Sequence, residues 1–349
     1  MHEWFGRNRW WLVRVIQLPI DILVFATLAF FFVRLMPGDP VMAIVGQSGA
    51  EYSDEDIAIL RDQMGLGGTL LDQLFAFWAG LFRLDLGTSI ASGAPVTQEV
   101  WSRLPSTMEL VGLGMFVALI FAFLLGFLYL RIDTRAVRSA IRGYASLATS
   151  IPVFVIGVFG IVLFFVAVQL APPPVGRVWT GGVVPTVTGF PLIDEVITGN
   201  WLLFASNLAH YVLPVGAIVL TYTPNLLVQL LGGLDREVEQ TTTRFQIASG
   251  ASRGWIYFSI FRRSLASVVV VFGQLFGMLL GGAVTLEQLF GLGGAGQLAT
   301  RSVASVDFPA LQGFLILVAV VCLVVYFLVD LVNMWLDPRR RPGVSTEDN

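Results

Sequence analysis

The sequence has few of the residues that soluble enzymes and nucleic-acid-binding proteins depend on. Lysine is absent, so the phosphate-binding motif G-x-x-x-x-G-K-[ST] cannot occur and the chain is not a nucleotidase of that type. The single cysteine, Cys322, lies in an apolar run, which excludes a disulfide framework and a thiol metal site. Two histidines, His2 and His210, cannot form a histidine cluster. We expect no catalytic residue, no metal site and no cofactor.

Charge is also scarce, because charged residues make up 13% of the chain and hydrophobic residues 56%. The net charge of −3 argues against nucleic acid as a partner. Long apolar runs with few charges are typical of helices that cross a lipid bilayer. Six such runs occur, at 15–33, 110–130, 143–176, 201–234, 265–286 and 308–329. The sequence therefore predicts an all-α integral membrane protein with six transmembrane helices.

The connections between these runs divide the chain into four parts. We expect a cytoplasmic segment and first transmembrane helix at 1–34, and a large extracytoplasmic loop at 35–106. A five-helix membrane core at 107–335 and a cytoplasmic tail at 336–349 complete the chain. Within the external loop, Ser53 and Asp56 form a capping pattern for a helix that Gly65 ends. The apolar segment 70–82 is too short to cross and is expected in the interface or against the spans.

The distribution of arginine predicts the orientation in the membrane. With the N-terminus inside, three arginines precede the first span, four and five lie in the two cytoplasmic loops, and three lie in the tail. The other six of the 21 basic residues are then outside. Basic residues stay preferentially on the cytoplasmic side. We therefore expect a multi-pass protein of the bacterial inner membrane with both termini in the cytoplasm.

The longest charge-bearing interruption in the second half is the cytoplasmic loop 235–264. Asp235 can cap a first short helix, Gly250 can end it in a left-handed conformation, and Ser252 can cap a second. Apolar or small residues then follow at spacings of 4, 3, 4 and 3, which is typical of one helical face. They are Ile247, Ala251, Gly254, Phe258 and Phe261. This pattern alone is consistent with a connecting loop on the membrane surface or with a docking element for a cytoplasmic partner.

Glycines in the fifth span allow close contact between helices. They are Gly273, Gly277, Gly281 and Gly282. Packing within the chain and a role in a pathway or subunit interface are equally consistent with this spacing. Two other motifs carry no weight. The glycines at 291–296 match G-x-G-x-x-G but follow a membrane span, and Ser48 with His210 lacks a base within predictable reach.

Short motifs occur in a fixed order from about Trp11 to Arg341. They are Leu35–Pro40, Leu60–Leu66, Leu84–Ser89, Arg103–Leu110, Ser150–Phe154, Leu213–Pro214, Leu286–Gly296, Asp307–Pro309 and Asp337–Arg339. In this order and spacing they resemble the B-type permease subunit of ABC importers, in the branch that transports dipeptides, oligopeptides and nickel. The resemblance implies a type I ABC importer permease architecture with a large extracytoplasmic loop after the first helix.

In that family the loop corresponding to 235–264 inserts into a groove of the ATPase subunit. The residues that the resemblance assigns to coupling are Arg244, Ala248, Gly250, Ala251, Trp255, Phe258, Phe261 and Arg263. The loop departs from the family pattern at its start, because Gln246 and Ile247 stand where the peptide branch usually has Ala-Arg. Ser249 replaces the usual lysine.

The resemblance also implies partners and a function without covalent chemistry. A second, similar permease would complete a heterodimer, two ATPase subunits would drive it, and an extracytoplasmic binding protein would deliver a peptide. ATP hydrolysis would reside in the partner subunits, so we expect no enzyme activity in this chain. Other solutes of the branch, a nickel chelate or a sugar, are the alternative cargo. An ion-coupled secondary transporter is the main rival class, but five of the six predicted spans lack an acidic residue in their core.

Overall fold

The computed structural model describes residues 2–48, 52–147, 151–176 and 186–336. Throughout these ranges the regular structure is helical, and one isolated antiparallel bridge joins Thr88 to Pro95. The predicted all-α class is confirmed. In a lipid bilayer a helix satisfies its own backbone hydrogen bonds, which is why apolar runs of this length fold as helices.

Five of the described helices are long and apolar enough to cross a membrane. They are α1 (His2–Arg34), α5 (Val96–Arg131), α9 (Trp201–Glu239), α11 (Arg253–Phe290) and α13 (Phe308–Leu336). Each contains one of the predicted spans, and each extends beyond it at one or both ends. The second of these five, α5, begins at Val96, inside the segment that the sequence assigns to the external loop.

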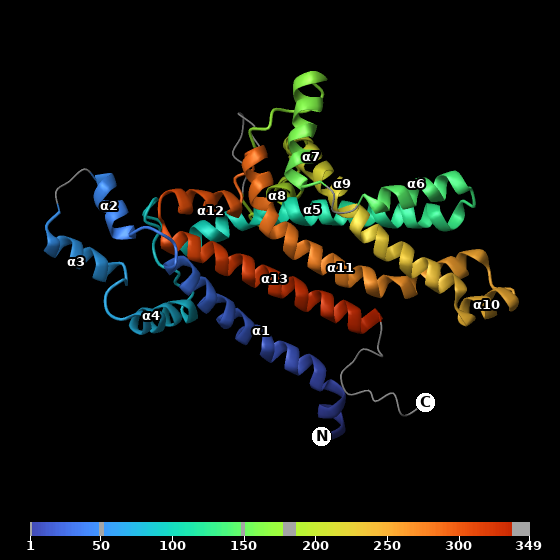
Figure 1. Cartoon of the computed structure of the whole chain (residues 1–349), viewed down its shortest axis with the longest axis horizontal. Helices are drawn as coiled ribbons and strands as arrows, with labels where there is room; N and C mark the ends of the chain where they lie inside the picture. Colours follow the sequence, from blue (N-terminus) through green and yellow to red (C-terminus); the bar gives the residue numbers. More distant parts are fainter. Residues whose placement is uncertain (1, 49–51, 148–150, 177–185, 337–349) are drawn as a thin grey trace.

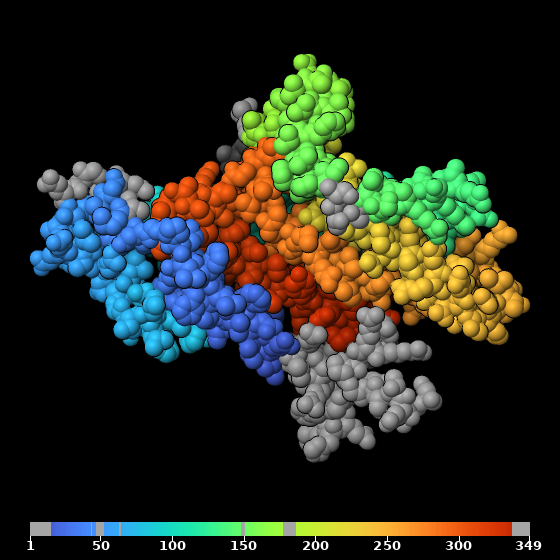
Figure 2. Space-filling model, viewed as in Figure 1, coloured from blue at the N-terminus to red at the C-terminus, as the bar shows by residue number. Residues whose placement is uncertain are grey.

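The predicted third span is not one uninterrupted helix. Its first residues, 143–146, belong to α6 (Arg135–Ser146), a separate short helix that carries three arginines. A separate apolar pair follows, α7 (Val153–Gly160) and the π-helical segment η1 (Ile161–Ala167). Pro152 is the residue before α7, and proline lacks the N–H that a continuing helix would need. Figure 2 shows the green segment that contains α7 and η1 standing out from the body of the molecule.

The short helices gather at the two ends of the long axis (Figure 1). At one end lie α2 (Pro40–Ser48), α3 (Asp54–Gln63), α4 (Leu70–Phe82) and α12 (Ala295–Ala304). At the other end lie α6 and α10 (Thr241–Ala248). The remaining short helix, α8 (Pro191–Ile197), packs against α9 and α5. The described short helices of the first predicted external loop are therefore at the opposite end from α6 and α10, which follow the predicted second and fourth crossings.

The core lies where α5, α9 and α11 pack together, and α1 lies along α13. Two glycines of α5 bring it close to α9, because a Cβ on Gly114 would collide with Ile218 and one on Gly126 with Leu230. Without side chains at these positions, the larger residues of α9 fill the space between the two backbones. Ile218 and Leu230 are fully buried as a result.

The segment after α1 folds back onto that helix. Ser53 and Asp56 form the predicted capping box of α3, and Gly65 has a φ of 66° just beyond its end. The short apolar helix α4 packs on α1, where Trp78 Nε1 donates to Thr27 Oγ1 at 3.0 Å and the rings of Phe77 and Phe30 lie 5.4 Å apart. The sequence left two places open for 70–82, the interface or the spans, and the contacts of α4 with α1 agree with the second.

A buried carboxylate joins α11 to α12. Glu287 is fully buried, and its side chain accepts hydrogen bonds from the Thr107 hydroxyl and from the backbone N–H groups of Gly296 (2.8 Å) and Gln297 (3.3 Å). Those N–H groups belong to the first turn of α12, which attracts negative charge. A Cβ on Gly294 would collide with this carboxylate. The glycine-rich motif therefore makes room for the Glu287 carboxylate at the start of α12.

Two further buried carboxylates, Glu109 and Asp307, also accept hydrogen bonds from backbone N–H groups and hydroxyls. Glu109 accepts from the Leu192 N–H at 2.7 Å and from the Tyr211 hydroxyl at 3.0 Å, which ties α5 to α8 and α9. Asp307 accepts from the Ser89 hydroxyl at 2.5 Å and from the Ala310 N–H at 3.1 Å. We call Glu109, Glu287 and Asp307 the buried carboxylate anchors.

Candidate functional site

The candidate site is the connection between α9 and α11, which contains α10. The sequence predicts that Asp235 caps a first helix here, and the structure corrects this. Asp235 lies inside α9, which continues to Glu239, and Gln240 occupies the position before α10. Asp235 instead accepts hydrogen bonds from the Tyr129 hydroxyl at 2.9 Å and from Arg142 at 3.1 Å. It thus ties α9 to α5 and α6.

The turn at Gly250 has the predicted left-handed conformation, with a φ of 76°. The Gly250 N–H donates to the Ile247 carbonyl at 3.1 Å, and the Ala251 N–H donates to the Gln246 carbonyl at 3.0 Å. This pair of bonds is a Schellman motif, which ends a helix and satisfies its last carbonyls. Glycine reaches this φ without the steric cost that a Cβ imposes. The sequence therefore specifies a fixed reversal after α10.

After the turn, the predicted second short helix is wrong as a separate element. Ser252 does cap a helix, because its Oγ accepts from the Trp255 N–H at 3.4 Å. That helix is α11, which continues without a break through the fifth predicted span to Phe290. The reason is that Arg262 and Arg263, which look like a boundary in the sequence, are good helix formers and do not interrupt it. Ile247 and Ala251 consequently share no helical face with the residues of α11.

Arg263 fixes α10 against the two long helices. Its Nε donates to Glu237 Oε2 at 2.5 Å, Nη1 to Ser259 Oγ at 2.5 Å and Nη2 to Thr243 Oγ1 at 2.8 Å. The Thr243 hydroxyl donates in turn to the Glu237 carbonyl at 2.7 Å, and Gln246 Nε2 donates to Ser259 Oγ at 3.1 Å. One guanidinium thus joins the end of α9, the start of α10 and the first turns of α11.

Sequence reasoning identified Arg263 but missed Glu237, Thr243 and Ser259. The Ser259–Arg263 pair has the i, i+4 spacing of neighbours on a helix, so it could have been noticed. Glu237 is 26 residues from Arg263, and no local pattern relates the two. We call Glu237, Thr243, Ser259 and Arg263 the loop clamp.

The other predicted coupling residues fall into two groups. The residues of the first group are exposed and lie on α10, on the turn after it and on the start of α11. They are Arg244, Ala248, Gly250, Trp255 and Phe258. Trp255 is 57% exposed and Phe258 56%, and their rings lie 5.8 Å apart. On α10, Ile247, which the sequence places on the apolar face, and Phe245, which the prediction omitted, are exposed to a similar degree. In contrast, Ala251 is half-buried, and Phe261 packs on the core with its ring 6.4 Å from that of Phe127.

The arrangement therefore presents apolar side chains on a backbone that is held in one geometry. Full burial of a large apolar side chain is worth about 1.5–3 kcal/mol, so four exposed ones favour contact with another apolar surface. They are Phe245, Ile247, Trp255 and Phe258. No reactive group is needed for this, and the site is suited to binding.

The glycines of the fifth span are divided between two surroundings. A Cβ on Gly273 would press on Val329, and one on Gly277 would collide with the Tyr326 hydroxyl, so both pack against α13. Gly281 and Gly282 have no heavy atom within 4 Å of such a Cβ. Packing within the chain therefore accounts for Gly273 and Gly277, and a pathway or interface role for Gly281 and Gly282 stays a prediction.

Comparisons with known proteins agree on one family. The model of the family described as "Binding-protein-dependent transport system inner membrane component" matches residues 118–342. A probable D,D-dipeptide transport system permease protein of Escherichia coli is 32% identical over 315 residues, which cover 89% of this chain and 91% of that protein. A putative peptide transport system permease protein of Brucella abortus is 28% identical over 95% of this chain and 98% of its own length. A nickel import system permease protein of Staphylococcus aureus is 27% identical over 97% and 93%, respectively.

Proposed function

This chain belongs to the family of binding-protein-dependent transport system inner membrane components, and from that premise we propose that it forms half of the translocation pathway of a peptide importer. A second permease completes the pathway, a binding protein outside the membrane delivers the peptide, and separate ATPase subunits supply the energy. The chain itself is a transport subunit without enzyme activity. The observation that carries the proposal is the clamped loop at α10 with its exposed apolar side chains.

The loop is proposed as the docking site for an ATPase subunit. A partner groove would bury the aromatic pair Trp255 and Phe258, and the loop clamp would transmit movement of that partner to α9 and α11. A loop that merely lay on the membrane surface would gain similar burial but would not need a fixed reversal at Gly250. The Schellman motif and the guanidinium of Arg263 therefore favour a protein partner.

The face of α11 that continues from Gly281 is proposed to line the pathway. Exposed residues follow one another at spacings of 4, 3, 4 and 3, so they share one side of the helix. They are Gln274, Met278, Gly281, Thr285 and Gln288. Polar side chains inside a membrane span generally face a water-filled cavity or a protein neighbour, because lipid offers them no hydrogen bonds. The second permease would face this side and enclose the pathway between the two subunits.

Both termini are proposed to be cytoplasmic, which requires that the chain cross the membrane six times. α5 ends next to α6 and α9 ends next to α10, at the same end of the molecule (Figure 1). The chain must return between Arg131 and Trp201, and α7 with η1 are the described helices available for that crossing. Many of their large apolar side chains are exposed, including Phe159 and Phe164. Lipid or the second permease would cover them.

The substrate is proposed to be a short peptide, since the relatives in Escherichia coli and Brucella abortus carry peptide transport in their names. The relative named for nickel import makes a nickel chelate the alternative cargo within the same branch. Uptake of defined peptides in a strain that lacks the gene decides between them. Unchanged peptide uptake together with lost nickel uptake would contradict the peptide assignment.

The docking proposal is tested with Gly250→Val and Phe258→Asp. Both variants should enter the membrane normally, bind less ATPase in co-purification and transport more slowly. Gly143→Val and Leu147→Asp are matched controls, because Gly143 has open space around it and Leu147 is 62% exposed near the same end of the molecule. Wild-type ATPase binding and transport by both loop variants would show that coupling uses another surface.

Orientation is tested by labelling cysteines introduced at Ser345 and Ser92 in a variant in which Cys322 is replaced by alanine. The proposal requires label access from opposite sides of the membrane. Access from the same side would contradict the six-crossing topology.

A further inference from the structure

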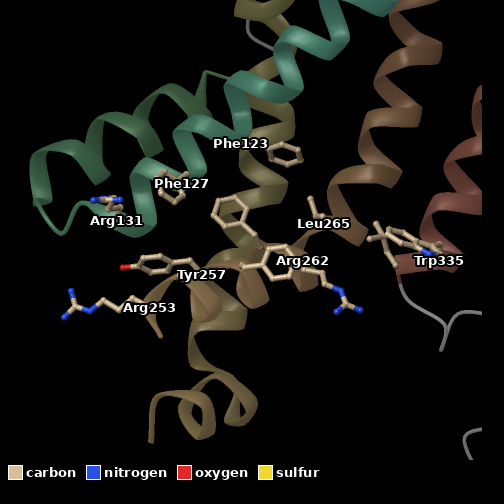
Figure 3. A pocket seen from close by; sticks show the side chains of 12 residues that line it. Phe123, Phe127, Arg131, Arg253, Tyr257, Arg262, Leu265 and Trp335 are labelled. Atoms are coloured by element: carbon tan, nitrogen blue, oxygen red, sulfur yellow. The ribbon is translucent and has the colours of Figure 1, made fainter. Parts of the chain in front are cut away.

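A groove opens where the ends of α5, α11 and α13 meet, beside the loop described above (Figure 3). Its volume of about 960 Å³ is at the upper end of the range for small-molecule pockets, which is roughly 300–1,000 Å³. The walls are largely apolar and aromatic, with Phe123 and Phe127 from α5, Tyr257 from α11 and Trp335 from α13. A cavity of this size and lining is suited to hydrocarbon chains.

Three arginines, Arg131, Arg253 and Arg262, lie among these apolar walls. In Figure 3, Arg131 and Arg253 lie at one end of the groove, and Arg262 extends on the side of Trp335. All three are exposed, and among the residues that the structure describes no aspartate or glutamate lines the groove. The groove thus combines an apolar interior with positive charge on both of these sides.

These three arginines differ from their neighbours in how their charge is compensated. Arg138 forms an ion pair with Asp133, Arg142 with Asp235, and Arg263 with Glu237. Within the part of the chain that the structure describes, no carboxylate lies within ion-pair distance of Arg131, Arg253 or Arg262. Exposed Arg135, Arg236 and Arg244 at this end also have no such pair among the described residues, so what distinguishes the three groove arginines is that their uncompensated charge lies beside apolar walls.

We propose that this groove binds an anionic phospholipid of the cytoplasmic leaflet, with its phosphate on the arginines and its acyl chains along the aromatic walls. This inference rests on the proposed orientation, which places Arg131 at the cytoplasmic end of α5. Guanidinium groups bind phosphate oxygens through paired hydrogen bonds. Basic pockets between transmembrane helices on the cytoplasmic side suit anionic headgroups.

The arginines and the apolar walls together identify this occupant. A soluble phosphate would use the arginines but would leave Phe123, Phe127 and Trp335 without a partner. A zwitterionic lipid would use the apolar walls, but its headgroup would bring no net charge to the arginines. An anionic phospholipid matches both. It would also lie directly against Tyr257 and Phe258, so the lipid would form part of the surroundings of the docking loop.

The test measures lipid retention by the full chain, without ATPase or peptide. Protein in mild detergent is titrated with phosphatidylglycerol and with phosphatidylcholine of the same acyl chains, and bound lipid is counted by native mass spectrometry. Arg131→Gln with Arg262→Gln is compared with Arg135→Gln and Arg236→Gln. The control pair removes the same charge from exposed sites at the same end that are not part of the groove.

Wild-type protein and the control pair should prefer phosphatidylglycerol. The groove pair should bind it about 25-fold more weakly, since each arginine near an anionic surface contributes about 1 kcal/mol, or about fivefold. Equal affinity of the groove pair and the control pair would overturn the proposal. Equal binding of the two lipids by the wild type would also overturn it.

Two further measurements identify the source of the phosphate and the place of binding. Glycerol phosphate at millimolar concentration should not displace the lipid, and displacement would show that the acyl chains contribute nothing. A photoreactive phosphatidylglycerol should label wild-type peptides that contain Tyr257 or Phe127, and labelling elsewhere alone would refute the site. A chain that imports peptides but retains no anionic lipid contradicts this inference and leaves the proposed function intact.

Discussion

The two ends of this molecule are held together by different chemistry. At the end with α12, the buried carboxylate anchors accept hydrogen bonds from backbone N–H groups of other segments of the chain. At the end with α10, the loop clamp joins partly exposed side chains, and Glu237 and Arg263 keep 20% and 29% of their side-chain surface accessible. Phe245, Ile247, Trp255 and Phe258 remain exposed beside this clamp. One end is held by buried hydrogen bonds, and the other presents apolar side chains that we propose a partner covers.

The largest expected effect comes from removing a buried anchor. Glu287→Ala leaves the N–H groups of Gly296 and Gln297 and the hydroxyl of Thr107 without their acceptor in a dry environment. We expect a loss of about 3 kcal/mol of stability, because buried donors without partners are costly. The measurement is the midpoint of thermal unfolding in detergent, with Glu239→Ala at an exposed position as control. A midpoint no lower than that of the control would remove the basis of the comparison.

A smaller effect should follow from crowding the same anchor. Gly294 has a φ of −79°, which alanine adopts freely, so Gly294→Ala tests the collision with Glu287 without backbone strain. We expect about 1–3 kcal/mol of destabilisation, which is typical of overpacking. Gly143→Ala, where the added methyl meets open space, should leave the unfolding midpoint unchanged or slightly raised. Similar midpoints for the two variants would mean that α12 can shift to accommodate a side chain.

The loop clamp should respond locally instead of globally. Arg263→Gln removes the ion pair with Glu237 and the bonds to Thr243 and Ser259. We expect faster amide hydrogen exchange in α10, corresponding to about 1–2 kcal/mol, with little change in the unfolding midpoint. The control is Arg236→Gln, at an exposed position at the end of α9. If α10 exchanged at the wild-type rate, the turn at Gly250 alone would be sufficient to hold it.

The smallest effect is expected at the cap of α11. Ser252→Ala removes one hydrogen bond to the Trp255 N–H, which is worth about 1 kcal/mol at a helix start. The loss should be confined to the first turn, since the remainder of α11 packs against α9 and α13. Hydrogen exchange of residues 253–256 measures it, with Ser139→Ala as control. Exchange that spread beyond this turn would indicate that the cap supports the whole loop.

Local chemistry allowed the turn to be predicted from the sequence. Gly250 and Ser252 act on their own backbone and near neighbours, so their types indicate their conformations. The helix boundaries at Asp235 and Arg263 were predicted incorrectly because charge in a sequence resembles a loop. In the fold, these two side chains find partners on other helices. Contacts between distant segments, such as Glu237 with Arg263, leave no local pattern.

The contacts of the buried carboxylate anchors also could not be predicted from the sequence. Glu287 and the glycines that follow it form a motif in the sequence, but the motif does not reveal that the carboxylate turns back onto α12. That geometry depends on Thr107, which lies 180 residues earlier in the chain. The composition and the long apolar runs were sufficient for the membrane class, whereas the buried network depends on contacts between distant segments.

The continuity of α11 has a mechanical consequence. A helix of 38 residues is about 57 Å long, and it extends from the docking loop to the Glu287 anchor. Gly273 and Gly277 bring it against α13 near the middle of that length, which is the place for a fulcrum. Tilting such a rod by about 5° around its midpoint moves each end by about 2.5 Å, in opposite directions. A push on α10 would thus reach the far side of the membrane as a displacement of opposite sign, carried by a single lever.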